Sequence, residues 1–516
     1  MPSTIVVAMG VAAATYSFLL ALLRLTQDAN EPPSVCDSIP FVSPIIQMAA
    51  RGVKFHKSIR DQYKHSIYTL RMPGARLYVV NDTSLIAPIQ SQPKTLSFAA
   101  VEARIAANLI GVNDATNKII GSNLMSDDGY LLQYPKYVHS SLAAGPGLDA
   151  MNRKAMQVFT ESLAKWTAQG DTPIKLFEWV RHELFVASSE SVYGPKNPFR
   201  DPSLEGAWQT LEQGMLMLLM GLPPKIFAKG ALAARESLVK AWEEYFESGA
   251  YEDSSMLVQA RVKINKDFGI PMKETARIEL GGNQALLSNT VPGAFWMVYH
   301  IYSNPAVLED IREEVSKGVR EEGGVCTIDL SFVTESCPIL LSTFKEMMRM
   351  ESTTVSARVV MEDCMLAGKY LLKKGSNLLI PASVHHTNQP TWGDSVGDFN
   401  HRRFLREPGV KRVSPVAFRG FGGGSTLCPG RHFAVSEILM LSALLVLRFD
   451  IVPMDGTWTR PPTAKSPIVP AFPTPDDDIR AELRPRDNRA WKVTFAKREK
   501  GMGIVAEDDE PASSGH

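Results

Sequence analysis

A run of seventeen residues, 418–434 (FRGFGGGSTLCPGRHFA), constrains this chain more than any other stretch. Four glycines precede a single cysteine, Cys428, and Pro429 then leads into an apolar, helix-like segment. Glycine is favoured where the backbone must turn tightly or approach another group closely. Such a loop is compatible with three kinds of site: a nucleotide-binding loop, a nucleophilic cysteine, and a thiolate that ligates a metal.

The nucleotide-binding alternative fits the residues poorly. A dinucleotide loop needs G-x-G-x-x-G, and a match that starts at Gly420 and Gly422 meets Ser425 where the last glycine is required. No strand–helix–strand unit surrounds the loop, and the Gly-Lys-Ser/Thr of a phosphate-binding loop is absent from it. A nucleophilic cysteine stays open, because its base can be distant in sequence. His432 is expected on the following helix and need not face the sulfur.

Metal ligation accounts for more of these residues. Pro429 suits the first turn of the helix that follows. A sulfur just before a helix N-terminus feels the positive end of the helix dipole, so we expect the loop to favour the thiolate form of Cys428. A thiolate is a strong axial ligand of haem iron and pushes electron density toward cleavage of the O–O bond.

The loop resembles a known signature at this point. Phe421, Gly424, Cys428 and Gly430 match the pattern F-x-x-G-x-x-x-C-x-G of the cytochrome P-450 monooxygenases. The resemblance runs from the N-terminus to about residue 492 and is specific after residue 273. It implies a mainly α fold with a small β portion, preceded by an N-terminal transmembrane helix. It also implies haem b as cofactor, with Cys428 as the axial ligand of the iron.

A second motif supports the resemblance. The segment FKEMMRM contains Glu346 and Arg349 at a spacing of three, which by itself indicates only an ion pair on a helix face. In the family this pair is buried and binds a further arginine, which the resemblance assigns to Arg403 in FNHRRF. His401 stands where the family usually has proline. The resemblance also assigns Arg358 to a haem propionate, a contact suited to the guanidinium fork.

The predicted oxygen site departs from the usual family pattern. The longest helical stretch, residues 273–304, should carry an acid followed by threonine; here Ser288 and Asn289 occupy those positions, followed by Thr290. Pro292 cannot donate a hydrogen bond, so we expect a kink at Ser288. SNTVPGAFW and FGGGSTLCPG together resemble the branch of cholesterol 7-alpha-hydroxylase, sterol 12-alpha-hydroxylase and prostacyclin synthase. Thr426 replaces the usual basic partner of a propionate.

The chain divides into four predicted regions. Residues 1–24 contain no charge before Arg24, which favours an uncleaved membrane anchor over a signal peptide. Residues 25–45 form a proline-rich connector, residues 46–495 the haem-binding catalytic domain, and residues 496–516 a polar tail expected to be disordered. Within the domain, residues 66–82 (SIYTLRMPGARLYVVND) alternate like a β-hairpin. The anchor and the lack of a disulfide pattern among five cysteines favour an endoplasmic reticulum protein with a cytosolic domain.

Composition and resemblance together define the expected partners. Basic and acidic residues balance at 55 each, which provides no footprint for nucleic acid. The resemblance implies oxygen insertion into a hydrophobic small molecule, such as a sterol, a terpenoid or a secondary metabolite. Electrons would come from NADPH through a separate cytochrome P-450 reductase, with cytochrome b5 as a further donor. Two alternatives stay open: a reductase-independent rearrangement enzyme of the prostacyclin synthase type, and a non-catalytic haem protein.

Overall fold

The computed structural model describes residues 2–36, 38–220, 223–406, 413–467 and 469–495. Most of this chain is helical, as predicted: α1 Pro2–Thr26, α2 Ser43–Arg51, α3 Phe55–Tyr63, α4 Ile86–Gln90, α5 Ala99–Ile105, α6 Asp114–Ile120, α7 Tyr130–Leu142, α8 Pro146–Gln169, α9 Leu176–Tyr193, α10 Pro202–Leu219, α11 Pro224–Phe227, α12 Lys229–Glu247, α13 Met256–Asp267, α14 Met272–Leu287, α15 Thr290–Tyr302, α16 Pro305–Ser316, α17 Leu330–Glu335, α18 Pro338–Glu351, α19 Ala382–His386, α20 Gln389–Trp392 and α21 Arg431–Arg448.

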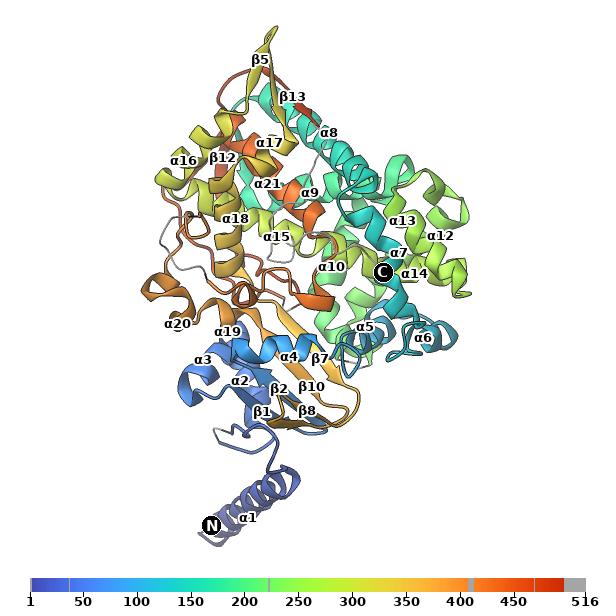
Figure 1. Cartoon of the computed structure of the whole chain (residues 1–516), viewed down its shortest axis with the longest axis vertical. Helices are drawn as coiled ribbons and strands as arrows, with labels where there is room; N and C mark the ends of the chain where they lie inside the picture. Colours follow the sequence, from blue (N-terminus) through green and yellow to red (C-terminus); the bar gives the residue numbers. More distant parts are fainter. Residues whose placement is uncertain (1, 37, 221–222, 407–412, 468, 496–516) are drawn as a thin grey trace.

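The strands are short and few in comparison. They are β1 Ile67–Met72, β2 Ala75–Val80, β3 Leu96–Ser97, β4 Thr172–Lys175, β5 Arg320–Glu322, β6 Val325–Asp329, β7 Val355–Val360, β8 Cys364–Leu366, β9 Tyr370–Leu372, β10 Asn377–Pro381, β11 Phe449–Pro453, β12 Arg480–Pro485 and β13 Ala490–Thr494. The largest sheet has the order β1-β2-β10-β7-β3 and lies at the end of the molecule nearest α1 (Figure 1).

The predicted hairpin is confirmed as β1 and β2, which pair antiparallel from Ile67 opposite Val80 to Met72 opposite Ala75. Strand β10 joins β2 in parallel and β7 antiparallel, so residues about 300 positions apart meet in one sheet. This pairing places β7, and Arg358 on it, in the interior of the sheet. The sheet lobe therefore contributes to the region around the cysteine loop.

The helical body is built around α15 and α21. Every residue of α15 is buried, and only Arg431 and Ala434 of α21 keep more than a small accessible surface. The predicted long helix at residues 273–304 is interrupted at Ser288 and Asn289, between α14 and α15. The interruption lies where the sequence predicts the kink. Helices that are apolar on most sides belong in the core, and these two lie within the main hydrophobic cluster together with residues of α8, α9, α12 and α18.

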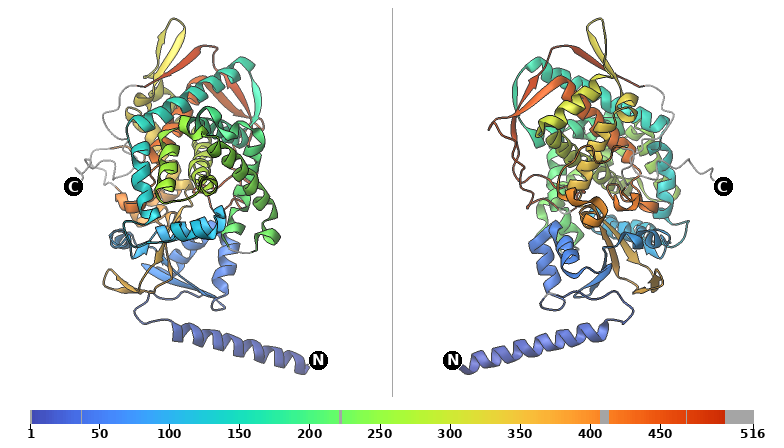
Figure 2. Two further views of the ribbon diagram at one scale, coloured as in Figure 1. Left: turned by 90° about the vertical axis from the view of Figure 1, so that its right-hand side faces the viewer. Right: turned by 60° about the vertical axis from the view of Figure 1, so that its left-hand side comes forward.

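The N-terminal helix stands apart from the body. Helix α1 extends away from the sheet end of the molecule (Figure 2). Its apolar side chains are almost all exposed. Its segment Thr4–Thr26 is, among the described residues, the one helix long and apolar enough to cross a membrane. An N-terminal apolar helix of this kind is consistent with a membrane anchor. The predicted disordered tail, residues 496–516, lies outside the described residues.

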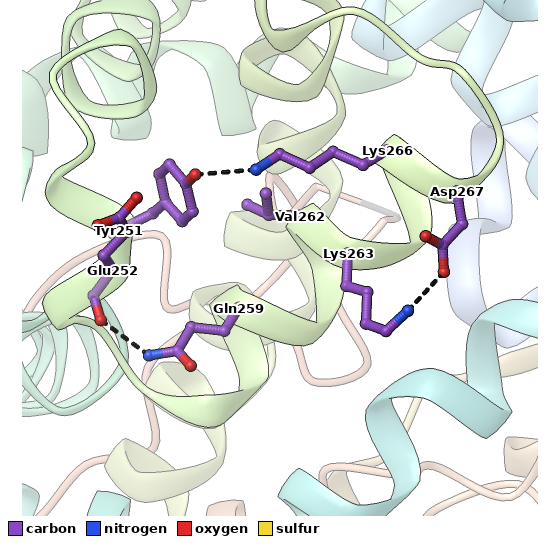
Figure 3. Close-up of a pocket in the computed structure, with 7 residues that line it drawn as sticks. All are labelled: Tyr251, Glu252, Gln259, Val262, Lys263, Lys266 and Asp267. Atoms are coloured by element: carbon purple, nitrogen blue, oxygen red, sulfur yellow. Dashed lines mark hydrogen bonds and ion pairs between the residues drawn. The ribbon is translucent and has the colours of Figure 1, made fainter.

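A surface pocket of about 330 Å³ is lined by residues of α13 and of the turn before it, and no residue of the cysteine loop contributes to it (Figure 3). Its polar lining groups bind one another: Lys266 Nζ donates to the Tyr251 hydroxyl at 2.9 Å, and Lys263 Nζ donates to Asp267 at 2.7 Å. Such internally paired surface groups leave little free bonding capacity for a ligand. The cysteine loop is therefore the stronger candidate for the functional site.

Candidate functional site

The cysteine loop is a tight turn closed by its own backbone. The Cys428 N–H donates to the Phe421 carbonyl at 3.0 Å, so the motif residues at the two ends of the loop are in direct contact. Gly422 and Gly424 have φ of +83° and +59°, angles that other residues rarely adopt. Gly430, by contrast, has φ of −83°, and a Cβ there would meet no described atom within 4 Å.

The Cys428 thiol lies ahead of α21 and is half-buried. Burial raises the pKa of the Cys428 thiol, while the N–H groups of Gly430 and Arg431 and the Arg431 charge act in the opposite direction. Burial outweighs the helix terminus, so our prediction that the loop itself favours the thiolate is wrong for the protein alone. A metal ion reverses this balance, because a coordinating thiol is deprotonated outright.

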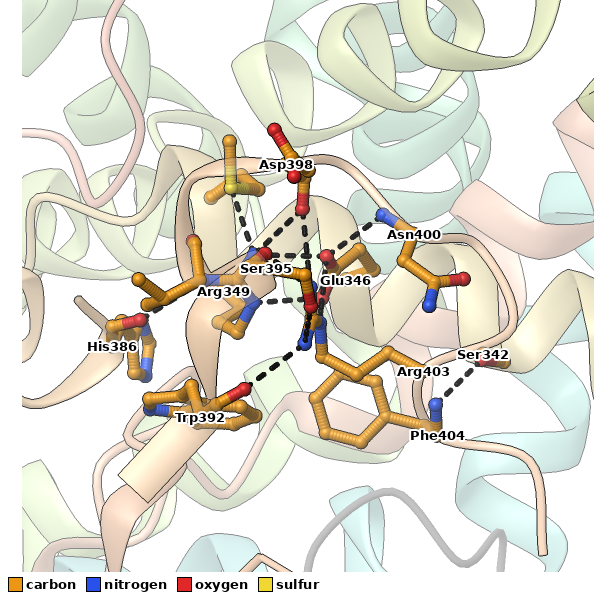
Figure 4. A network of polar contacts seen from close by, with 12 residues as sticks. Ser342, Glu346, Arg349, His386, Trp392, Ser395, Asp398, Asn400, Arg403 and Phe404 are labelled. Atoms are coloured by element: carbon orange, nitrogen blue, oxygen red, sulfur yellow. Dashed lines mark hydrogen bonds and ion pairs between the residues drawn. The ribbon is translucent and has the colours of Figure 1, made fainter. Parts of the chain in front are cut away.

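Glu346, Arg349 and Arg403 are brought together by α18 and the segment before residue 406 (Figure 4). Arg349 donates through Nε and Nη2 to the Glu346 carboxylate at 2.7 and 2.8 Å. Arg403 Nε donates to both oxygens of Glu346, at 3.0 and 3.1 Å. The Glu346 side chain has no exposed surface, so this carboxylate is shared by two guanidinium groups inside the protein.

The same arginines fasten the chain that leads to the cysteine loop. Arg349 Nη1 donates to the carbonyls of His386 and Val396, at 3.0 and 2.9 Å. Arg403 Nη2 donates to the Ser395 carbonyl at 2.7 Å. His401, found where the family usually has proline, pairs with Asp310 instead, at 2.7 Å. Charge-assisted bonds of this kind hold an otherwise irregular segment in one conformation.

Arg358 on β7 is buried with 3% of its surface exposed, and its Nη2 donates to the Thr426 hydroxyl. Burial, followed by the charge of Arg419, lowers the pKa of Arg358 to about 10. Arg419 is itself buried and packs against Gly423 of the cysteine loop. Two buried guanidinium groups near one another, beside the loop, form a cationic place that favours an anionic group.

The three residues predicted for oxygen chemistry lie at the interruption between α14 and α15. The Ser288 hydroxyl donates to Gln284 Oε1 at 3.1 Å, and the Thr290 hydroxyl donates to the Leu286 carbonyl at 3.2 Å, so both are bound within the helices. Asn289 instead reaches outward and accepts the Ala471 N–H at 2.8 Å through Oδ1. The structure thus groups the three residues but directs their side chains differently.

Sequence reasoning missed two charged groups near these sites. Arg419 stands in a glycine-rich stretch, where an arginine is usually exposed, and only the fold shows its burial beside Arg358. Glu212 on α10 brings a carboxyl to Ser288 across the core. Burial raises the pKa of the Glu212 carboxyl, opposed by the Ser288 hydroxyl and the Arg181 charge. No local pattern in the sequence predicts that Arg419 lies beside Arg358 or that Glu212 lies beside Ser288.

Comparison with known proteins places this site in a family. The family model described as Cytochrome P450 matches residues 287–479, which include all the motifs discussed above. The cytochrome P450 monooxygenase nodJ of Hypoxylon pulicicidum is 34% identical over 476 residues, covering 90% of this chain and 91% of its own length. This chain belongs to the cytochrome P450 family. A cytochrome P450 monooxygenase of Gibberella zeae is 28% identical over 488 residues, 92% of each protein.

Cholesterol 7-alpha-monooxygenase of Cricetulus griseus is similar to this P450 as well. It is 22% identical over 492 residues, 88% of this chain and 94% of its own length. The resemblance to the cholesterol 7-alpha-hydroxylases inferred from SNTVPGAFW and FGGGSTLCPG is thus confirmed by similarity along the chain. Membership of the family makes the protein an oxidoreductase whose cofactor is haem with a cysteine thiolate on the iron.

The residues at the loop fit that cofactor. The backbone angle of Gly430 is one that any residue can adopt, and no described atom lies close to where its Cβ would be. A flat group that lies against Cys428 would explain why glycine is found at this position, because it would need the space that a side chain would fill. Cys428 would ligate the iron, with Phe421 and Gly424 shaping the loop, and Arg358 would bind a propionate. Haem supplies the oxygen chemistry. The chain itself contributes a thiol oriented by the N–H groups of Gly430 and Arg431 and a buried cation for the carboxylate.

Proposed function

We propose that this P450 is a membrane-anchored haem-thiolate monooxygenase with Cys428 as the iron ligand. It would insert an oxygen atom from O₂ into a hydrophobic small molecule, with electrons from NADPH supplied by a separate reductase. The proposal rests above all on the cysteine loop, which combines a half-buried thiol, two N–H groups directed at its sulfur and an open space beside Gly430. The relatives named as monooxygenases along nearly the whole chain support it.

The substrate class is proposed from the same relatives. Cholesterol 7-alpha-monooxygenase and 25-hydroxycholesterol 7-alpha-hydroxylase are named for sterols. Together with the apolar N-terminal helix, they favour a rigid hydrophobic substrate such as a sterol or terpenoid, taken up from the membrane. Helix α1 as an anchor would place the body on the cytosolic face of the endoplasmic reticulum, where an NADPH-dependent reductase, with or without cytochrome b5, would dock.

The first test is the difference spectrum of the reduced protein with carbon monoxide. Wild type should give the Soret band typical of thiolate ligation, and Cys428→Ser should abolish it while the far-UV circular dichroism stays the same. Cys337→Ser serves as a matched control, because Cys337 is a buried thiol whose pKa is raised to about 12. A thiolate band that survives Cys428→Ser would refute the ligand assignment.

A rearrangement reaction is the second candidate, and the presence of asparagine at position 289 favours it. The position where the family usually has threonine carries an amide that can donate a hydrogen bond but does not release a proton at neutral pH. Turnover with NADPH and a reductase separates the two functions. Consumption of NADPH with hydroxylated product supports monooxygenation; conversion of an organic peroxide without NADPH supports rearrangement. Haem binding without either reaction would support the non-catalytic alternative.

A further inference from the structure

Helix α5 brings an acidic side chain, Glu102, to the buried cation Arg358. Phe98, directly before α5, and Glu102 are spaced at i and i+4, so both lie on one side of the helix. The Arg358 guanidinium lies over the Phe98 ring, with Cζ 5.5 Å from the ring centre. The charges of Glu102 and Arg358 act on each other. The ring and the carboxyl of α5 therefore flank the same guanidinium.

Glu102 and Arg358 are neighbours that do not form an ion pair. Arg358 donates to the Ala357 carbonyl at 2.7 Å and to the Thr426 hydroxyl. In the described part of the chain, no carboxylate oxygen lies within 4 Å of its guanidinium, and the Glu102 carboxyl has no hydrogen-bond partner. Opposite charges inside a protein are stable when they bond directly, since burial without a partner is costly. Both groups therefore keep bonding capacity for a third one.

The surroundings of Glu102 favour its protonated form. Burial raises the pKa of the Glu102 carboxyl to about 7, and the Arg358 charge acts in the opposite direction. Tyr130 and Tyr134 of α7 also lie within its reach, and burial above all, with the Glu102 charge as a smaller cause, raises the pKa of both phenols. Arg104 of α5 is exposed and donates to β10 instead. Among the described residues, Arg358 is the one permanently charged group that acts on this carboxyl.

A carboxylate that binds Arg358 would change this balance. It would offset the positive charge that holds the Glu102 proton loosely, and it would be a like charge beside Glu102. Two carboxyl groups that share one site cannot both ionise readily, so one of them keeps its proton and the two titrate as a pair. Arg419, whose charge also acts on Arg358, keeps the place cationic enough to receive the carboxylate.

We propose that Glu102 is a further haem-binding residue, which as a carboxylic acid donates a hydrogen bond to the propionate that Arg358 binds. The propionate and Glu102 then share one proton. This role of Glu102 rests on the proposed function, because it requires haem beside Cys428. It makes retention of haem depend on pH. The shared proton is present at low pH, and its loss as the pH rises leaves two like charges next to each other, so the haem is held less tightly.

The rate of haem release from the full-length holoprotein tests this role. Transfer of haem to an excess of apomyoglobin is followed by absorbance at about pH 6 and about pH 8.5. Wild type should release haem about ten-fold faster at the higher pH, the factor that corresponds to one hydrogen bond to a charged group. Glu102→Gln keeps a neutral donor at both pH values and should release haem slowly at both.

Glu183→Gln is the matched control for Glu102→Gln. Glu183 on α9 is also buried, and burial raises the pKa of its carboxyl, but it accepts bonds from Ser162 and Trp166 instead of lying beside Arg358. This variant should show the same increase with pH as wild type. A release rate that does not change with pH in wild type, or that rises equally in Glu102→Gln, would overturn the shared proton.

A second measurement needs no substitution. In haem dimethyl ester both propionates are blocked, so no proton can be shared with Glu102. Wild type reconstituted with the ester should therefore release it at the same rate at both pH values. A ten-fold rise that persists with the ester would also overturn the role of Glu102. Loss of the thiolate spectrum with the pH pattern intact would instead overturn the iron ligand of the proposed function and leave the propionate contact in place.

Discussion

Replacing Glu346 with alanine should destabilise the protein more than any other single change in the α18 network. The side chain has no exposed surface and accepts bonds from Arg349 and Arg403 at 2.7–3.1 Å and from the Asn400 N–H at 3.0 Å. Its removal leaves two guanidinium groups without their carboxylate. Breaking a buried ion pair by deleting one partner costs about 3–5 kcal/mol. That is a large part of the roughly 5–15 kcal/mol by which a domain is stable.

The size of the effect should depend on the charge left behind. Arg403→Ala leaves Glu346 paired with Arg349, a balanced pair, and so should cost less than Glu346→Ala. Asp310→Ala is the matched control in the neighbouring segment, because Arg402, its partner at 2.7 Å, is half-exposed. Surface pairs contribute about 0–1 kcal/mol. The expected order of destabilisation is therefore Glu346→Ala, Arg403→Ala, then Asp310→Ala.

Proteolysis across a urea series measures these differences, since it reports the population of unfolded chain without assuming a spectroscopic signal. Haem content measured on the same samples shows whether loss of the network releases the cofactor. If Glu346→Ala and Asp310→Ala lowered the urea midpoint equally, the carboxylate would not be compensating buried charge, and the reasoning from burial would be refuted.

Two further predictions concern the loop and the core. Gly423→Ala places a Cβ 2.5 Å from Arg419 Nη1, and overpacking of this kind costs about 1–3 kcal/mol of stability. In Gly430→Ala the new Cβ meets no described atom. This second variant should weaken haem binding and leave the apo-protein as stable as before. Apo-protein urea midpoints and haem titration separate the two variants, and equal apo-protein midpoints would contradict the assignment. Burial raises the pKa of Glu437 from 4.5 to about 8, so the folded chain keeps a proton that the unfolded chain releases, and stability should fall as pH rises from 4.5 to 8. Glu437→Gln should flatten that fall in urea midpoints, and an unchanged slope would exclude this carboxyl as its source.

Local patterns carried most of what the sequence could predict. The hairpin at β1 and β2 alternates over a few residues, and the spacing of Glu346 and Arg349 is a single helical turn, so both follow from neighbours in the chain. The interruption at Ser288 follows from the sequence as well, because Pro292 has no N–H group to donate to the Ser288 carbonyl. The mainly helical fold with a small β portion was implied by the family resemblance, which itself rests on short motifs.

Contacts between distant segments could not be predicted in this way. The motif predicts that Asn289 acts on oxygen, and the structure adds a contact that no motif indicates: its side-chain oxygen binds Ala471, 182 residues further on. The sequence shows a polar residue at a helix interruption and, far along the chain, the segment Pro-Ala-Phe-Pro at residues 470–473. That the two are in contact depends on how α15 packs in the folded protein. The burial of Arg419 beside Arg358 depends likewise on the sheet lobe meeting the loop.

Long-range contacts help to explain why glycines precede Cys428. Gly422 and Gly424 are required by their positive φ angles, and Gly423 and Gly424 also by side chains that press against them. Gln90, at the end of α4 in the sheet lobe, lies about 3 Å from where a Cβ of Gly424 would be, and Arg358 from the same lobe contacts Thr426. The helical body fixes the far end of the loop through α21. Cys428 is therefore positioned jointly by both parts of the molecule, so a substitution at the lobe that displaces Gln90 or Arg358 should also displace the thiol.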